Sequence, residues 1–362
     1  MKTERDFAPR WSSPPSETIN EILSSRGISQ AEFSLMIDLP LSDIDNLLSG
    51  TDELSLLVAR RLSEQLGASP DFWVARFCQY QDDIERVAAA DWTDSLPIEE
   101  LTQMGWVRKE TDWRDRIDAC LDFFGVPDFP TWQASYQDRL ADAMFRRNQK
   151  VQLSPALVTW LRMGELAASK VKTENPWNAA IFEDSLEQAR ALTRLADPKR
   201  FIPRLAEICE VAGVILLVIR APSGCQASGV SRFIDGRPII QMSARYLSDD
   251  HFWFTFFHEA AHVIRHGPDE IFIDELDYRA PAETAQENEA DTFASQTLLP
   301  LTYTQLKSLP RDKRSIINTA RKWGISPGIL IGQLQHHGII AFSSLNGYKR
   351  RYRWSGAILE KA

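Results

Sequence analysis

The pentapeptide at 258–262, H-E-A-A-H, constrains this chain more than any other stretch. Residues four apart on an α-helix are separated by about 40° around its axis, so His258 and His262 project from one face toward one point. Two imidazoles placed in this way can hold a zinc ion, and Glu259 between them can take a proton from a water on that ion. Apolar residues before the motif and Gly267 after it predict a largely buried helix. The alternative is a core helix whose histidines are satisfied by hydrogen bonds alone.

A second carboxylate-bearing segment follows at 287–294, E-N-E-A-D-T-F-A. A hydrolytic zinc site needs three protein ligands and one open position for water. On a helix, the small or apolar residues at 290, 294 and 298 lie within about 60° of Glu287, whereas Glu289 points about 200° away, toward solvent. We therefore expect Glu287 to be the third ligand, and Asp291 to hold the outer nitrogen of a ligand histidine. For His266, a further candidate ligand, we expect a structural or supporting role.

The composition indicates a globular protein without a membrane segment. With 362 residues, 44% of them apolar, the chain is long enough for two or three domains with real cores. No apolar run approaches the roughly 18 residues that a membrane span needs, and the start, M-K-T-E-R-D, lacks the apolar core of a signal peptide. The four cysteines form no Cys-x-x-Cys pair, which is typical of reduced thiols. We therefore expect a cytoplasmic protein.

Helix and strand signals along the chain predict an α+β fold that is mostly α. We expect a flexible arm (1–15), a helix-turn-helix bundle (16–80), a helical connecting region (81–200), a zincin-like core (201–300) and a basic helical C-terminal segment (301–362).

Within the expected core, three runs rich in β-branched and apolar residues predict a small antiparallel sheet. They lie at 214–219, 227–233 and 238–243, and Asp235-Gly236 makes a tight turn between the last two. Zinc peptidases commonly bind substrate as an extra strand at such a sheet edge. Beyond the core, residues 311–337 predict two helices.

Short helices are expected throughout residues 16–80, with the third over 42–48. Their order resembles the Xre-type helix-turn-helix of HigA-like antitoxins. In such a domain the third helix enters the major groove of DNA, which would make Ser42 and Asn46 DNA-binding residues. That helix, however, carries two aspartates and no Lys or Arg, and residues 16–80 have a net charge of −6, whereas phosphate attraction dominates DNA affinity. A module for dimerisation or protein docking is the alternative.

Charge is distributed unevenly over the second half of the chain. Residues 248–300 carry 2 Lys or Arg against 12 Asp or Glu, and residues 301–362 carry 11 against 2. The run at 349–354, K-R-R-Y-R-W, interleaves basic and aromatic residues and can hold single-stranded nucleic acid through phosphates and stacking. The alternative, which we favour, is that the basic tail neutralises the acidic catalytic segment or the helix-turn-helix within the same chain.

These motifs together resemble the ImmA/IrrE family of zinc metallopeptidases in its long form, fused to a helix-turn-helix domain. The most specific matches are the histidine motif with Phe254-Thr255 before it, and the segment 287–294 with Leu298-Leu299-Pro300 after it. Supporting matches are Phe145-Arg146, 160–165 (W-L-R-M-G-E), 324–329 (G-I-S-P-G-I) and 332–335 (G-Q-L-Q). The resemblance extends from about residue 16 to about residue 354.

The resemblance implies a site-specific endopeptidase with one Zn²⁺ per chain. It makes His258, His262 and Glu287 the metal ligands and Glu259 the general base. It also implies that the substrate is a protein, either a transcriptional repressor or an antitoxin-like regulator in a stress, prophage or defence circuit.

Two questions stay open from the sequence. The side chain that stabilises the oxyanion during hydrolysis is one of Tyr278, Arg279 and His251. The alternative class of protein is a DNA-binding regulator or antitoxin in which the peptidase fold serves as a sensor or scaffold. In either class the helix-turn-helix can pair the chain into a homodimer.

Overall fold

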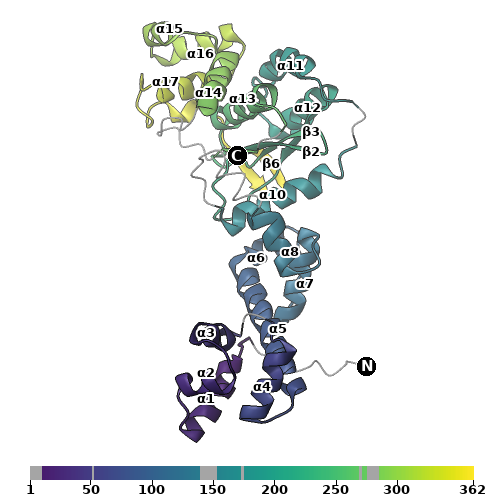
Figure 1. Cartoon of the computed structure of the whole chain (residues 1–362). Coiled ribbons are helices and arrows are strands. Elements are labelled where there is room, and N and C mark those ends of the chain that lie inside the picture. The colour runs from purple at the N-terminus through teal and green to yellow at the C-terminus, as the bar shows by residue number, and fades with distance from the viewer. Residues whose placement is uncertain (1–9, 51–52, 139–152, 173–174, 269–270, 275–284) are drawn as a thin grey trace. The chain divides into compact units, whose positions relative to one another are not determined.

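The structure, a computed structural model, describes residues 10–50, 53–138, 153–172, 175–268, 271–274 and 285–362. The chain divides into two compact units, Met1–Ser95 with Lys109–Phe129, and Leu96–Arg108 with Pro130–Ala362. The described residues are mostly helical with two small sheets (Figure 1), which confirms the expected α+β class. In these described segments no helix combines the length and the apolar character that a bilayer crossing requires.

The first unit is built from helices packed around a larger apolar core and a smaller one between its last two helices. They are α1 (Pro15–Arg26), α2 (Gln30–Met36), α3 (Leu41–Ser49), α4 (Leu56–Leu66), α5 (Pro70–Ser95) and α7 (Trp113–Phe124). A capping box at Ser29 begins α2. The Ser29 hydroxyl accepts a hydrogen bond from the main-chain amide of Glu32, and the Glu32 carboxylate accepts one from the main-chain amide of Ser29. Phe33, Trp73 and Phe77 are buried where α2 and α5 meet the core. The domain boundary expected at residue 80 lies inside α5.

The second unit combines helices with a four-stranded sheet. The longer helices are α10 (Pro155–Ala168), α11 (Ala179–Leu192), α12 (Pro198–Val211), α13 (Asp249–Arg265), α14 (Ala285–Leu298), α16 (Lys313–Trp323) and α17 (Pro327–His336). The short helical turns are α6 (Ile98–Gln103), α8 (Phe129–Trp132), η1 (Gln133–Asp138), α15 (Tyr303–Ser308) and η2 (Asn346–Tyr348). The strands are β1 (Ile215–Val218), β2 (Gly229–Ile234), β3 (Arg237–Met242) and β4 (Phe272–Asp274).

The sheet is mixed, so the expectation of an antiparallel sheet was wrong. Its strand order is β1-β3-β2-β4, in which β1 and β3 are parallel while β2 is antiparallel to both β3 and β4. The tight turn at 235–236 does form a β2–β3 hairpin. After β1, however, the chain forms β2 two positions away in the sheet. The next strand, β3, fills the position between them and runs parallel to β1. The fourth strand, β4, was not expected.

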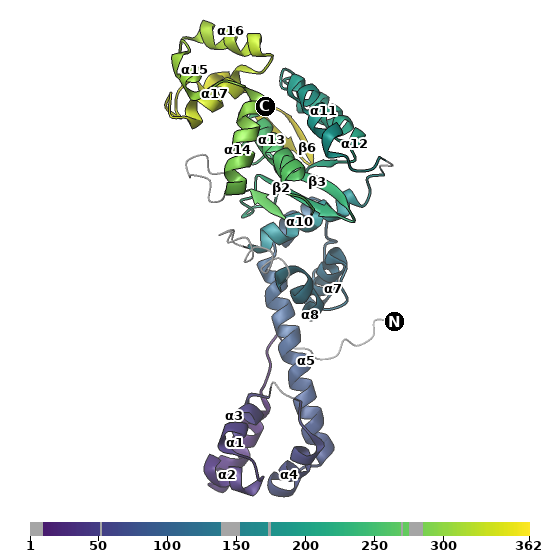
Figure 2. The same cartoon turned by 45° about the horizontal axis from the view of Figure 1, so that its top comes forward.

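Helix α13 covers one face of this sheet and α10 lies on the other (Figure 2). The segment 160–165 fixes α10 to the strands. Trp160 donates its indole N–H to the Ile219 carbonyl at 3.0 Å, and Gln241 donates its amide to the Trp160 carbonyl at 2.7 Å. Arg232 of β2, 5% exposed, donates to a carboxylate oxygen of Glu165 at 3.1 Å. The W-L-R-M-G-E motif is therefore a packing device between helix and sheet.

The C-terminal segment ends in strands, where the sequence had suggested helices throughout. After α16 and α17 the chain forms a hairpin from β5 (Tyr352–Ser355) and β6 (Ile358–Lys361). Tyr352 and Leu359 are each 3% exposed and belong to the main core of the second unit. Burial of these two side chains explains why the tail leaves the helical conformation.

Two basic residues of the tail bind within the chain. Lys349 forms an ion pair with Asp250 at 2.5 Å, with both side chains 7% exposed. Arg350 donates to the main-chain carbonyls of Thr193 and Leu195 at 2.7 and 2.9 Å. These contacts join the tail to α13 and to the end of α11.

Candidate metal centre

Helix α13 brings the histidine motif into the core. Asp249 and Asp250 occupy its first turn, where negative charge complements the helix dipole. The helix is apolar on nearly all sides, and its aromatic residues pack into the main core of the second unit. As a result His258 and His262, each 1% exposed, lie between α13, the sheet and α14.

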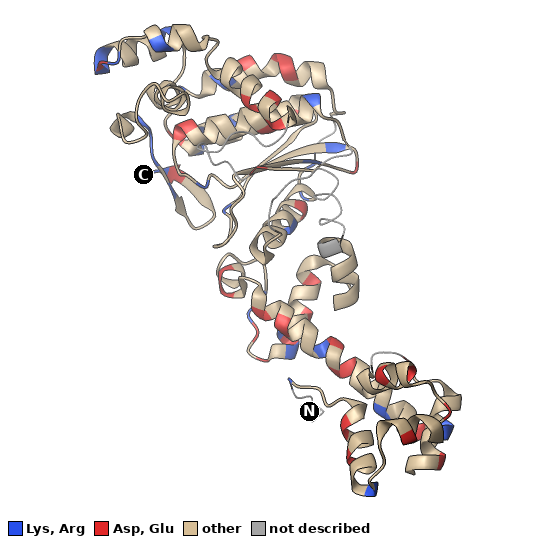
Figure 3. Ribbon diagram, turned by 60° about the vertical axis from the view of Figure 1, so that its left-hand side comes forward, with Lys and Arg blue, Asp and Glu red and all other residues tan. Residues whose placement is uncertain are grey.

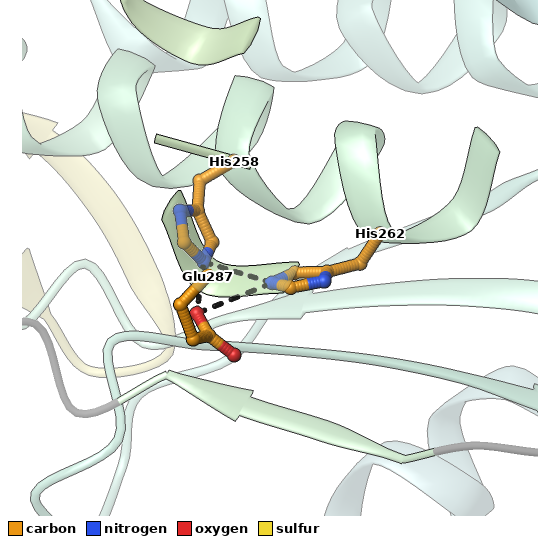
Figure 4. A group of neighbouring side chains, drawn as sticks. All are labelled: His258, His262 and Glu287. Atoms are coloured by element: carbon orange, nitrogen blue, oxygen red, sulfur yellow. Dashed lines mark hydrogen bonds and ion pairs between the residues drawn. The ribbon is translucent and has the colours of Figure 1, made fainter. Parts of the chain in front are cut away.

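Three side chains converge beneath this helix (Figure 4). His258 Nε2 lies 3.0 Å from His262 Nε2, and Glu287 Oε2 lies 3.1 Å from the first and 3.4 Å from the second. Three corners of a tetrahedron around zinc, each about 2.0–2.1 Å from the ion, are about 3.3 Å apart. Two imidazole nitrogens and one carboxylate oxygen at this spacing therefore fit one zinc ion.

The outer nitrogens of both histidines also have partners. Asp291 Oδ1 lies 2.9 Å from His258 Nδ1, and His266 Nδ1 lies 2.9 Å from His262 Nδ1. The Phe272 ring of β4 stacks on the His262 ring at 3.8 Å between centroids. These contacts hold both imidazoles with Nε2 toward the centre, which is the orientation that a shared metal ion requires.

Helix α14 presents Glu287 through a face of small side chains. Ala290, Ala294 and Leu298 are buried against α13. Glu289 is exposed, and its carboxylate lies 3.4 Å from His266 Nε2. The small residues allow the two helices to approach closely. This approach brings Glu287 to the histidines.

Glu259 is completely buried beside this group. Neither of its carboxylate oxygens has a hydrogen-bond partner among the described residues, which is rare for a buried carboxylate. The side chain lies over Gly229, the first residue of β2, where an added Cβ would stand 2.3 Å from Glu259 Oε1. Burial raises the pKa of Glu259 well above its usual 4.5, although the charge of His258 opposes the shift. The nearby charge of a divalent cation would favour its ionised form.

Their surroundings shift the pKa values of all three candidate ligand side chains in the metal-free centre. Burial lowers the pKa of His258, but the charge of Asp274 and hydrogen bonds to Asp291 and Glu287 outweigh it, so the pKa lies well above 6.5. Burial lowers the pKa of His262 to about 3. Burial also opposes ionisation of Glu287, yet hydrogen bonds with both histidines hold its pKa far below the usual value. The site thus combines one free imidazole lone pair, one carboxylate and one proton that a metal ion would displace.

Two residues of the site were missed by the sequence analysis. Asp274, the last residue of β4, is 7% exposed, and its charge raises the pKa of both His258 and Glu259. Gly229 leaves the space that Glu259 fills. Neither residue belongs to a motif, so only the strand register reveals them.

Of the three candidate oxyanion donors, His251 lies within the described residues, and it is not at the centre. Tyr278 and Arg279 lie outside the described residues, as do Phe145 and Arg146 of the family resemblance. His251 lies seven residues before His258 on α13, about 10 Å away along the helix axis, and it lines a separate cavity.

The two residues proposed for DNA contact lie on the exposed face of α3. Ser42 and Asn46 are solvent-exposed, and the Ser42 hydroxyl donates to Asp43 at 3.0 Å. Asp45 is exposed on the same helix. Acidic positions outnumber basic ones on the helices at the N-terminal end of the chain (Figure 3), so this surface is poorly suited to bind phosphates.

The histidine pair on a buried helix, the glutamate from the next helix and the buried Glu259 match the pattern of metal donors and general base found in metallopeptidases. Comparison with protein families agrees with this class. Residues 211–334 match the family model Peptidase_M78, described as an IrrE N-terminal-like domain. The matched region is about a third of the chain, contains the whole centre and supports the ImmA/IrrE resemblance there. No curated protein and no solved structure matches the chain at a significant level.

Proposed function

We propose that this protein is a zinc-dependent endopeptidase that hydrolyses a peptide bond in a partner protein. One observation carries the proposal: His258, His262 and Glu287 offer three ligand atoms at tetrahedral spacing, and beside them the Glu259 carboxylate is buried without a hydrogen-bond partner among the described residues. A structural histidine cluster would not need a buried carboxylate without a partner, because that arrangement costs stability.

Each side chain has a defined part in the proposed reaction. His258, His262 and Glu287 would hold a zinc ion, which when bound would supply a water of lowered pKa and Lewis-acid activation of the scissile carbonyl. Glu259 would accept a proton from the attacking water and deliver it to the leaving amine. Asp291 and His266 keep the imidazoles in the orientation that leaves their Nε2 atoms free.

The substrate is proposed to bind as an additional strand along β4. This strand pairs with β2 on one side, and among the described residues no strand pairs with its other side. Its Phe272 contacts His262, so the free edge lies next to the metal ligands. Backbone pairing at this edge would hold an extended peptide across the centre. Following the family resemblance, we propose a repressor or an antitoxin as the substrate.

The N-terminal helices fit protein docking better than DNA recognition. The exposed face of α3 presents Asp43 and Asp45 beside Ser42 and Asn46, and a duplex would repel these charges. We propose that they recognise the substrate protein or a second copy of the chain.

The proposal can be tested with the full chain, stripped of metal and reloaded with zinc. It would be incubated with the small protein encoded next to it in the genome and with denatured casein, and new termini would be identified by mass spectrometry. We expect new termini only in the zinc-loaded sample. A zinc-loaded chain that produces none, yet binds its own promoter sequence-specifically, would establish the regulator class instead.

Replacing Asp291 with alanine should weaken zinc binding without removing a ligand. The substitution deletes the partner of His258 Nδ1, and loss of such a partner typically lowers metal affinity by about 10–100-fold. A competition titration against a chromophoric chelator measures the change. Thr292→Ala, exposed on the next position of α14, is the control and should bind zinc like the wild type. An unchanged affinity in Asp291→Ala would rule out the supporting role.

Replacing Gly229 with alanine should impair hydrolysis while zinc stays bound. The new methyl group would lie 2.3 Å from Glu259 Oε1 and 2.8 Å from Thr255 Cγ2, so the carboxylate has to move. A displacement of about 1 Å can cost about 10²-fold in rate. Gly347→Ala, where no atom lies within 4 Å, is the control. Normal kcat/KM in Gly229→Ala would show that the position of Glu259 is not critical.

A further inference from the structure

A cavity of about 500 Å³ opens on the metal-binding face of α13, toward the N-terminal end of that helix. Its lining includes His251 and Phe254, which precede His258 by seven and four residues and therefore share its helix face. The Phe254 ring lies 6.2 Å from the His258 ring and 6.3 Å from the His336 ring. The Phe254 ring thus lines the cavity and lies next to His258, the first of the proposed metal ligands.

The cavity also lies at the end of the sheet toward which β4 runs. Gly229 begins β2 and pairs with both Met242 at the end of β3 and Asp274 at the end of β4. Gln226, just before β2, and Arg245, just after β3, both line the cavity. A polypeptide paired along β4 would pass the metal ligands and reach the cavity.

The charges of the cavity favour an anionic occupant. Lys349 and Asp250 neutralise each other in their buried ion pair, and Lys349 also donates to Gln335 at 2.7 Å. Arg245 and Arg351 are exposed at the cavity, and among the described residues neither guanidinium has a carboxylate partner. Within the described part of the chain, two positive charges therefore remain unbalanced at the cavity.

Neighbouring groups set the position of one of these guanidinium groups and add no charge. Arg245 donates to the main-chain carbonyl of Gln226 and lies over the Tyr246 ring at 5.3 Å. The Tyr246 ring lies 4.2 Å from the His251 ring. Burial lowers the pKa of His251 to about 4, despite the opposing charge of Asp250, so this imidazole is neutral at physiological pH. The guanidinium groups retain free donors for a carboxylate.

We propose that this cavity is a specificity subsite that binds an Asp or Glu side chain of the polypeptide substrate, close to the bond that is cut. The assignment rests on the proposed peptidase function. The arginines of the cavity would repel a basic side chain. An apolar side chain would displace water from the arginines without offering them a partner in return. An acidic side chain instead finds two guanidinium partners in a cavity that is also lined by Phe254, one helical turn before His258.

The test measures which peptides of a random library the full-length protein binds. The full-length, zinc-loaded Glu259→Gln variant is immobilised and exposed to a randomised, C-terminally amidated nonapeptide library, and retained peptides are sequenced by mass spectrometry. We expect Asp and Glu to be enriched over Asn and Gln by about fivefold, as partly exposed ion pairs allow. The enrichment should disappear when Arg245→Gln and Arg351→Gln are added. It should persist with Arg237→Gln and Arg353→Gln, two exposed arginines outside the cavity.

Cleavage of the same library by the zinc-loaded wild type separates the two proposals. Acidic enrichment that depends on Arg245 and Arg351 supports the subsite, whether or not the wild type cuts any peptide. Cleavage without acidic enrichment overturns the subsite and leaves the peptidase intact. An enrichment that survives loss of both arginines also overturns it, because the carboxylate is then bound elsewhere.

Discussion

Glu259→Gln is expected to abolish hydrolysis while the chain keeps its zinc. Gln has the same size and fills the same buried space over Gly229, but it cannot accept the proton of the attacking water. A positioned general base typically contributes about 10²–10⁴-fold, so kcat/KM should fall by at least that factor. The measurement pairs initial rates of substrate cleavage with zinc per chain by elemental analysis.

The same substitution should not weaken the metal-free fold. Burial raises the pKa of Glu259 in the folded chain, so the folded state binds more protons than the unfolded state above pH 4.5. The carboxylate therefore reduces stability as pH rises, and this penalty is absent from the amide. We expect the metal-free variant to melt at or above the wild-type temperature at pH 8.

Glu207→Gln serves as the matched control for this experiment. Glu207 is exposed on α12, away from the centre, and its replacement should change neither rate nor melting temperature. Cleavage retained by Glu259→Gln would rule out this residue as the base. A large fall in melting temperature would show instead that its role is structural.

The part of the site that lies within single helices could be predicted from the sequence. Helical periodicity is local, so the spacing of His258 and His262 alone puts them on one face of α13. The same geometry distinguished Glu287 and Asp291, which face α13, from the exposed Glu289.

The part of the site that depends on strand pairing could not be predicted. Asp274 and Gly229 reach the centre because β4 pairs with the first residues of β2, and no local pattern encodes that register. The parallel pairing of β1 with β3 was missed for the same reason. It arises because β2 pairs with one edge of β3 and leaves the other edge free for β1. The cavity beside Phe254 has the same origin, because the tail, the loops of the sheet and α17 all contribute to it.

His262→Ala is expected to remove zinc from the protein. The wild type should carry about one zinc per chain, because two imidazole nitrogens and one carboxylate oxygen lie at tetrahedral spacing. The variant retains only His258 and Glu287, which together provide two of the three ligands that a hydrolytic zinc site needs. Zinc should therefore fall to background after dialysis, and hydrolysis should disappear with it.

His337→Ala is the control for this experiment, because it removes a histidine that is not one of the proposed metal ligands. His337 follows α17, is partly exposed and contacts Tyr303, so its removal should leave one zinc per chain. Circular dichroism of both variants checks that they are folded. Zinc retained at wild-type level by folded His262→Ala would show that the metal, if bound, is held elsewhere. No zinc in the wild type even after reconstitution would remove the metal from the proposed mechanism, and Glu259 would then have no activated water to deprotonate.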